Sequence, residues 1–207
     1  MSDPPYRIVT ERLVARCWEP GDAPLLKEAV DSSLDHLRPW MPWARDEPQT
    51  LEQKVDLLRA FRGQFDRGEN FVYGLFSADE SEVVGGSGLH ARDGDGISLE
   101  IGYWIRASAI GRGYATEVSA ALARIGLEVC GADRIEIRVD PENEPSAKVP
   151  RKLGFFEEAR LRRRLLSGPG EEPRDALIFT LFRDTLADSP VASARFEAFD
   201  AAGTRVL

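Results

Sequence analysis

The sequence predicts an α/β protein, an α+β arrangement with one mixed sheet, and three observations support this. Three adjacent β segments, 70–77, 82–89 and 97–105, are joined by short turns and fit an antiparallel meander. A turn containing two glycines then leads into a helix whose apolar residues recur every three or four positions. A further strand follows this helix, which adds parallel pairing. The order βαα-βββ-αβ-αββ is typical of helices packed on a mixed sheet.

The first third of the chain combines one strand, two helices and an aromatic loop. The predicted elements are a strand at 12–18, a helix at 22–30, a loop at 38–44 and a helix at 50–68. Asp22 fits the cap of the first helix. Two prolines exclude regular structure from the loop. Thr50 and Gln53 match a capping box at the start of the second helix, and an apolar stripe follows them.

The second half adds a strand-helix-strand unit and a C-terminal hairpin of strands. The predicted elements are a helix ending near Cys130, a strand at 134–139, a short helix at 145–153, and strands at 155–161 and 175–182. Turns are expected at 93–96 and 168–173. We expect residues 1–183 to form one domain, and 184–207 to be a tail that is either a small hairpin or disordered.

Composition narrows the functional class. The chain has 207 residues, a net charge of −8 and 43% hydrophobic residues, which is ordinary for a globular protein without a general nucleic-acid-binding surface. Cys17 and Cys130 are predicted to be buried thiols rather than a disulfide framework. No apolar run approaches a membrane span, no targeting segment precedes the first strand, and no metal-ligand pattern is present. A cytoplasmic location is expected.

The segment RASAIGRGYATEV, residues 106–118, raises the question of what its glycines hold. A Gly-x-Gly turn between strand and helix presents backbone N–H groups to an anion. The dinucleotide fingerprint fails because Thr116 stands where a third glycine is needed, and the Gly-Lys-Ser/Thr ending of a P-loop is absent. The alternative is that Gly111 and Gly113 only permit a tight turn.

Flanking motifs decide between these interpretations. The chain reads EIGYWIRASAIGRGYA at 100–115 and DPENEPSAKVPRKLGF at 140–155, after a TERL strand and an RPWMPW segment. In this order and spacing, the motifs closely resemble the GNAT superfamily of N-acetyltransferases, in the branch typified by the RimJ/RimL enzymes. The resemblance implies the GNAT fold, in which two parallel strands of a mixed sheet splay apart and helices flank the sheet.

The resemblance further implies that acetyl-CoA lies in this opening, with its pyrophosphate in the glycine turn and no metal. It departs from the family pattern at Ser108, where Arg or Gln is commonest. For Arg112, a solvated surface role is the alternative to a phosphate contact. The implied cofactor-binding residues are Trp104, Ile105, Ser108, Ile110, Gly111, Arg112, Gly113, Tyr114, Ala115, Thr116, Asn143, Ser146 and Arg151.

Acetyl transfer to an amine needs a base, and Glu100 is the first candidate. Alternation places Glu100 with Gly102 and Trp104 on one face of the strand at 97–105, opposite the apolar residues. A carboxylate in mid-strand beside a glycine is unusual unless it meets a ligand, and the family often has a catalytic or water-relaying Glu here. A solvated carboxylate at a strand end is the alternative.

The thiolate that leaves needs a proton, and the family's usual tyrosine is replaced here by Pro150. Ser146 is the substitute that this branch suggests, because a hydroxyl can hydrogen-bond the sulfur or relay a proton. Ser146 as a helix cap, and Asn143 as a plain turn residue, are the competing interpretations. Lys148, Arg151 and Lys152 form a cationic face that fits either the 3′-phosphate or solvent.

The acceptor is expected to be a primary amine, either a peptide N-terminus or a small molecule. Trp40 and Trp43, on the proline-containing loop, are candidates for the wall of its groove together with Glu100, and core packing is their alternative. We expect a monomer or homodimer. A coenzyme-binding regulatory protein without catalysis is the second functional hypothesis.

Overall fold

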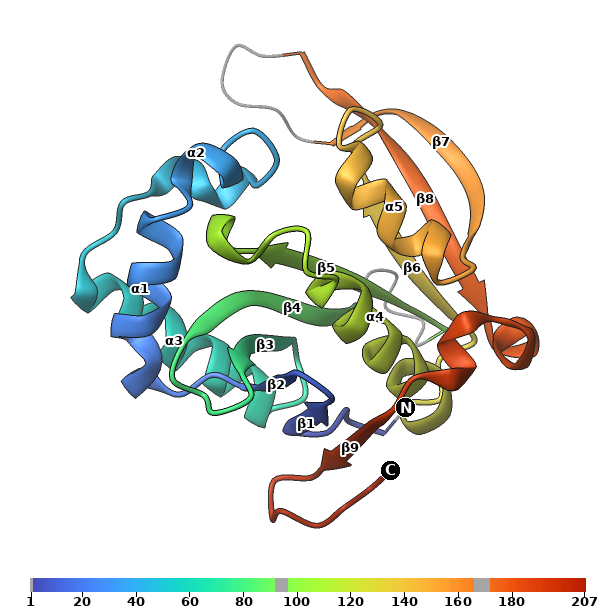
Figure 1. Cartoon of the computed structure of the whole chain (residues 1–207), viewed down its shortest axis with the longest axis horizontal. Helices are drawn as coiled ribbons and strands as arrows, with labels where there is room; N and C mark the ends of the chain where they lie inside the picture. The colour runs from blue at the N-terminus through green and yellow to red at the C-terminus, as the bar shows by residue number, and fades with distance from the viewer. Residues whose placement is uncertain (1, 92–96, 166–171) are drawn as a thin grey trace.

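The computed structural model describes residues 2–91, 97–165 and 172–207, and within them nine strands form one sheet (Figure 1). The sheet order is β7-β8-β6-β5-β4-β3-β2-β1-β9. The strands are β1 Arg7–Thr10, β2 Leu13–Cys17, β3 Phe71–Ser77, β4 Val83–Ala91, β5 Ser98–Ile105, β6 Arg134–Val139, β7 Phe156–Leu165, β8 Arg174–Phe182 and β9 Phe196–Phe199. The predicted antiparallel meander is therefore confirmed as β3-β4-β5.

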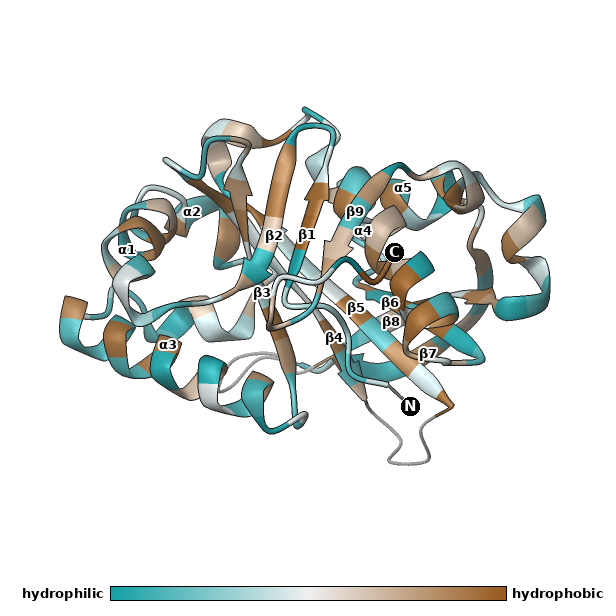
Figure 2. Ribbon diagram, turned by 90° about the horizontal axis from the view of Figure 1, so that it is seen from below, coloured by the Kyte–Doolittle hydropathy of each residue, from teal (hydrophilic) through white to brown (hydrophobic). Residues whose placement is uncertain are grey.

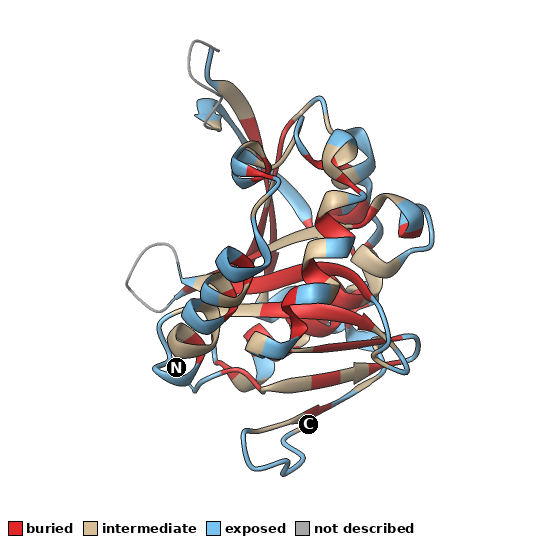
Figure 3. Ribbon diagram, turned by 90° about the vertical axis from the view of Figure 1, so that its left-hand side faces the viewer, coloured by how far each residue is buried: buried red, intermediate tan, exposed pale blue. Residues whose placement is uncertain are grey.

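Helices cover both faces of the sheet, and its central strands lie buried between them (Figure 3), whereas the edge strand β7 is mostly exposed. The helices are α1 Ala23–Asp31, α2 Leu34–Leu37, α3 Leu51–Asp66, α4 Tyr114–Arg124 and α5 Glu144–Lys152. One apolar cluster, which contains Val118 and Leu122, packs between α4 and the sheet. A second cluster, which contains Leu26 and Leu58, packs α1 and α3 on the opposite face. Apolar residues accordingly gather along the strands in Figure 2.

The sheet is split between β5 and β6. These strands run parallel, but only Ser98–Glu100 pair with Arg134–Glu136. Beyond Glu100, β5 stays paired with β4 as far as Ile105, whereas β6 stays paired with β8 as far as Val139. The two strands therefore diverge, with α2 and α5 on either side of the opening (Figure 1). The mixed sheet predicted from the sequence is confirmed, and so are the splayed parallel strands that the family resemblance implied.

Helix α3 begins where its capping box predicted. The Thr50 hydroxyl accepts from the Gln53 amide at 3.2 Å, and the Gln53 side chain accepts from the Thr50 amide at 2.8 Å. Within α3, the side chain of Lys54 is buried, which is unusual for a lysine, and it forms an ion pair with the carboxylate of Glu47. This ion pair anchors the end of the aromatic loop. Leu51, the first residue of α3, is exposed, so it is not part of the apolar stripe that this helix buries.

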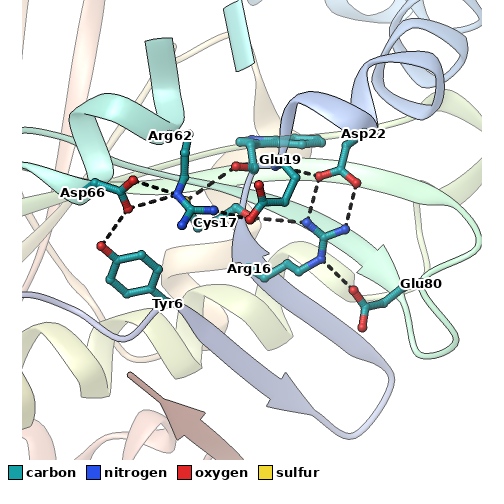
Figure 4. Close-up of polar contacts among 9 residues, drawn as sticks. Tyr6, Arg16, Cys17, Glu19, Asp22, Arg62, Asp66 and Glu80 are labelled. Atoms are coloured by element: carbon teal, nitrogen blue, oxygen red, sulfur yellow. Dashed lines mark hydrogen bonds and ion pairs between the residues drawn. The ribbon is translucent and has the colours of Figure 1, made fainter. Parts of the chain in front are cut away.

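The N-terminal region holds a network of charged groups outside the sheet opening (Figure 4). We name it the N-terminal charge cluster, and it consists of Tyr6, Arg16, Glu19, Asp22, Arg62, Asp66 and Glu80. Arg16 pairs with Asp22 at 2.8 Å and with Glu80 at 2.6 Å. Arg62 pairs with Asp66 at 2.9 Å. The cluster connects Tyr6, just before β1, and Arg16 of β2 to α3 and to the turns around Asp22 and Glu80.

Several elements differ from their predicted bounds. The strand at 12–18 is β2, and the sequence interpretation missed β1 at Arg7–Thr10. The helix predicted to end near Cys130 is α4, and it continues as a π-helical turn, Ile125–Val129. That turn brings Gly126 against Ile135, where a Cβ would lie 2.4 Å from the isoleucine side chain. The turn predicted at 93–96 and most of that at 168–173 lie outside the described residues.

The segment after β8 returns along α4 to the far edge of the sheet. β9 pairs antiparallel with β1, and residues 200–204 turn the chain back so that Val206 donates to Ala198 at 2.8 Å. Arg124 of α4 donates to the Ala194 carbonyl at 2.9 Å and its guanidinium lies over Phe196. Residues 196–199 therefore complete the β1 edge, while the division at 183/184 stays a prediction.

Both predicted thiols are buried and free, and burial raises the pKa of Cys17 and of Cys130 to about 12. Across the described ranges, no helix combines the length and apolar character of a membrane span. Nor do three or more His, Cys, Asp or Glu side chains gather there in a way that would hold a metal ion.

Candidate active site

A cavity of about 660 Å³ lies where the sheet opens, bounded by the end of β5, the start of α4, helix α5 and the α2 region. Tyr103 and Trp104 both line it, although neighbours on a strand point to opposite faces. The cavity therefore wraps around the end of β5 and reaches both faces of the sheet. The predicted site residues that line it are Trp40, Trp104, Ile105, Ile110, Gly111, Gly113, Tyr114, Ala115, Thr116, Asn143 and Ser146.

The glycine turn sits at one end of the cavity. Gly113 is the N-cap of α4 with φ 82°, and Gly111 has φ 74°, so both occupy the left-handed region that glycine tolerates. A Cβ added to Gly111 would have no heavy atom within 4 Å. The space beside Gly111 is therefore open to a ligand, and the positive end of α4 faces it.

The turn is held from outside the cavity by residues that the sequence interpretation did not select. Glu117, in the first turn of α4, accepts from Arg12 Nε at 2.7 Å and from the Thr10 hydroxyl at 2.6 Å. Arg12 in turn donates to the Arg112 carbonyl at 2.8 Å. This chain of contacts fixes the glycine turn against β1 and β2, and it leaves the turn's inner surface to the cavity.

Five predicted cofactor or acceptor residues lie outside the cavity lining: Trp43, Glu100, Ser108, Arg112 and Arg151. Arg112 is exposed and donates to the Ser108 carbonyl at 3.0 Å. Arg151 pairs with Glu144 at 3.1 Å, and its guanidinium lies over Phe179. Trp43 packs edge-on against Trp104 with ring centroids 5.8 Å apart. Ser108 and Arg112 therefore contact each other within the glycine turn, and Arg151 forms its ion pair within α5. Trp43 supports the cavity wall by packing against Trp104.

Two lysines of α5, Lys148 and Lys152, line the cavity instead of Arg151. They lie four residues apart, so they share one face of the helix. Among the described residues neither ammonium group has a carboxylate within ion-pair distance. The sequence signal was available as the cationic face of this helix, but Arg151 was the member chosen. An unpaired cation beside an open cavity favours an anionic ligand.

Helix α5 begins with Asn143, whose side chain accepts from the Ser146 amide at 3.2 Å. Asn143 is therefore the cap, and the interpretation of Ser146 as the cap is wrong. The Ser146 hydroxyl is available to the cavity, where it meets Tyr103 at 3.1 Å. Burial raises the pKa of Tyr103 to about 12, partly offset by its hydrogen bond to Ser146. Tyr103 stays protonated over the physiological range.

The α2 region closes the other end of the cavity with apolar and aromatic side chains. Trp40, Leu37 and Met41 line this end together with His36. Arg174 lies over the Trp40 ring with its guanidinium 5.9 Å from the centroid, and it pairs with Asp140 at 2.5 Å. The Trp40 segment is thus held against β8 on the far side of the sheet opening.

Glu100 lies deeper in the sheet than the cavity lining. It is 9% exposed and pairs with Arg138 at 2.8 Å, so the alternative of a solvated strand-end carboxylate is wrong. Glu100 shares a face with Trp104, four residues along the strand, a separation of about 13 Å. Because Glu100 does not line the cavity, proton transfer between the two would need a relay.

A sheet opened between parallel strands, with a glycine turn at the start of a helix, defines an anion-binding α/β protein. The particular family follows from sequence: the profile of the acetyltransferase (GNAT) domain matches residues 12–156, and the chain belongs to this family. It is therefore an N-acetyltransferase by class.

Curated relatives and solved structures agree with this assignment. The chain is 29% identical over 160 residues to the [ribosomal protein uS5]-alanine N-acetyltransferase of Escherichia coli, covering 75% of this chain and 80% of the relative. It is 27% identical over 153 residues to the uncharacterized N-acetyltransferase YoaA of Bacillus subtilis, covering 74% and 84%. The structure of Mycobacterium smegmatis RimJ in complex with CoA-disulfide superposes with a TM-score of 0.75 at 25% identity, covering 92% and 95%.

Proposed function

We propose that this protein transfers the acetyl group of acetyl-CoA to a primary amine by direct attack, without a covalent enzyme intermediate. The observation that carries the proposal is the cavity in the opened sheet, with a glycine turn at one end and two unpaired lysines along one wall. The open space beside Gly111 fits a pyrophosphate approached by backbone amides. Lys148 and Lys152 suit the further phosphate of the coenzyme.

The reaction requires the acceptor amine to be neutral and the departing sulfur to be protonated. In this proposal Ser146, at the cavity wall, supplies the proton to the sulfur. Glu100 receives the amine proton through water, because its carboxylate is buried but lies outside the cavity lining. Arg138 keeps this carboxylate in place. No cysteine takes part, since both thiols are buried with raised pKa values.

For the acceptor, we propose a peptide N-terminus beginning with a small residue. One support is the E. coli relative, whose name states that it acetylates an alanine of ribosomal protein uS5. Another is the acceptor end of the cavity, where Trp40, Leu37 and Met41 present apolar surface and the described lining residues include no carboxylate that would hold a second cationic group. Such a wall suits a short uncharged side chain next to the reacting amine.

The proposal is tested by thiol release from acetyl-CoA with a panel of N-terminal peptides, polyamines, amino acids and aminoglycosides. We expect turnover with peptides that begin with alanine or serine. Turnover confined to a small amine would keep the enzyme and change its acceptor. Tight acetyl-CoA binding by calorimetry with no thiol release across the panel would favour the second hypothesis, a coenzyme-binding protein without catalysis.

The role of Glu100 has its own test in the variant Glu100→Gln. A general base contributes on the order of 100-fold or more, so turnover at pH 7 should fall by about that factor. The loss should shrink at high pH, where the free amine no longer needs a base. A loss that is the same at every pH would instead assign Glu100 to positioning of Arg138 and β6.

A further inference from the structure

We propose that Tyr103 is a positioning residue for Ser146, fixing the serine hydroxyl inside the opened sheet. The inference rests on the proposed acetyl transfer. Tyr103 stands on β5, three residues past Glu100, which is the end of the pairing with β6. Ser146 stands in the first turn of α5. The tyrosine hydroxyl reaches from β5 to α5 and lies 3.0 Å from the Ser146 carbonyl oxygen and 3.1 Å from Ser146 Oγ.

The carbonyl contact has a cause in the sequence. In an α-helix, the carbonyl of residue 146 accepts from the amide of residue 150. Residue 150 is Pro150, which has no amide hydrogen, so the Ser146 carbonyl has no donor within the helix. The Tyr103 hydroxyl donates to it from the other side of the opening. Pro150 therefore has two effects. It stands where many relatives have a tyrosine, and it leaves the Ser146 carbonyl free to accept from Tyr103.

These two contacts fix the direction in which the Ser146 hydroxyl donates its hydrogen. The Tyr103 hydroxyl has one hydrogen. When that hydrogen is donated in a hydrogen bond to the Ser146 carbonyl, the phenol oxygen can only accept a hydrogen bond from Ser146 Oγ. The serine proton is then shared between the phenol oxygen and a sulfur that arrives in the cavity. Because burial keeps Tyr103 protonated, its donor role does not change over the working pH range.

In the reaction, the carbon–sulfur bond of the tetrahedral intermediate breaks and the electron pair stays on sulfur. The sulfur takes the proton of Ser146 Oγ, and Oγ takes the proton that the acetylated nitrogen loses. The products are the amide and the free thiol, and the serine is restored. Tyr103 neither gains nor loses a proton in this sequence; it holds Oγ within reach of both atoms.

The test compares Tyr103→Phe, Ser146→Ala and the double variant in kcat, in KM for acetyl-CoA and in calorimetric affinity for CoA. We expect Tyr103→Phe to lower kcat on the order of tenfold, with KM and CoA affinity changed by less than about twofold. The double variant should be no slower than Ser146→Ala, because Tyr103 acts through the serine. Ser146→Thr should retain turnover. Tyr6→Phe, which removes a hydroxyl far from the cavity, is the matched control.

Pro150→Ala separates positioning from helix stability. In the Tyr103→Phe background, it returns an amide donor to the Ser146 carbonyl, so it should recover thermal stability but not kcat. Recovery of kcat would overturn the inference, as would additive losses in the double variant. Full activity of Tyr103→Phe would also overturn it while leaving acetyl transfer intact. If the unaltered protein turned over no acceptor in the panel, the proposed function and this inference would fail together.

Discussion

The N-terminal charge cluster and the cavity differ in whether their charged side chains have partners. In the cluster, each guanidinium meets carboxylates: Arg16 holds Asp22 and Glu80, and Arg62 holds Glu19 and Asp66 (Figure 4). Burial and the bond to Asp66 raise the pKa of Tyr6 to about 12, and bonds from Tyr6 and Arg62 lower the pKa of Asp66 against the effect of its burial. In the cavity, Lys148 and Lys152 have no such partner among the described residues.

The paired charges of the cluster stabilise the fold, whereas the unpaired charges of the cavity are available to a ligand. Ion pairs within the cluster are satisfied without any other molecule, so they hold β2 and α3 to the neighbouring turns whether or not substrate is present. Unpaired lysines beside an open cavity contribute nothing to the folded chain alone, and their mutual repulsion opposes it slightly. Variants in the two regions should therefore affect different measurements: stability in the first region and ligand affinity in the second.

The largest effect is expected from Lys54→Met, in the N-terminal region. Glu47 is buried with Lys54, so removing the ammonium leaves a carboxylate without its counter-charge. We expect a loss of about 3–5 kcal/mol in the free energy of unfolding, measured by urea denaturation. The double variant Lys54→Met/Glu47→Leu should regain much of it. A double variant as unstable as the single one would place the cost in packing rather than in charge.

Gly111→Asp should have the largest effect in the cavity. A carboxylate at this φ of 74° would stand where we place the pyrophosphate, and like charges about 4 Å apart repel by several kcal/mol even when partly screened. Affinity for acetyl-CoA should fall on the order of 100-fold by calorimetry. Gly203→Asp is a matched control, since Gly203 has φ 77° and likewise no heavy atom within 4 Å of an added Cβ. Equal affinity in both variants would refute the pyrophosphate assignment.

A smaller loss is expected from Lys148→Ala/Lys152→Ala. If these ammonium groups contact phosphate, affinity for acetyl-CoA should fall about tenfold and become less sensitive to salt. Stability should be unchanged or slightly higher. Lys27→Ala removes an ammonium that is already paired with Asp31 at 2.6 Å and should leave the affinity as it was. An equal loss in Lys27→Ala would mean that general charge, not the cavity, attracts the ligand.

The smallest effect is expected from Glu80→Gln. A hydrogen bond from Arg7 lowers the pKa of Glu80, so the carboxylate stabilises the fold above its unfolded pKa and loses that contribution as pH falls through its folded pKa. We expect a loss of up to about 1 kcal/mol at pH 7 and none near pH 2. Glu82→Gln, whose carboxylate pairs with no described residue, is the control. A loss that persists at low pH would point to the turn conformation instead.

Local signals explain what the sequence predicted well. The capping box at Thr50, the β3-β4-β5 meander and the glycine turn before α4 depend on residues within a few positions of each other, so their patterns are visible in the chain. The cavity lining at the glycine turn followed from the same motif. Family resemblance supplied the ligand and the opened sheet, which periodicity alone does not encode.

The features that were missed depend on distant partners. β1 has only four residues, and its edge is completed by β9, nearly 190 residues further along. Alternation along the strand places Tyr103 on the apolar face opposite Glu100, and the contact of its hydroxyl with Ser146 depends on the position of α5 in the folded chain. Glu100 was recognised as unusual, but its pairing with Arg138 needs the register of β5 and β6. These contacts join residues far apart in the sequence, so they can be identified only in the folded sheet.

The pairing of β9 with β1 has a consequence for biosynthesis. β1 emerges early from the ribosome, whereas the strand that covers its outer edge is made only after every other strand of the sheet. Until then a growing chain carries β1 as an open edge, a template for mispairing with other chains. In the folded chain, the two contacts of Arg124 hold the returning segment beside α4. Until β9 is made, the β1 edge is therefore a place where the nascent chain is exposed to mispairing.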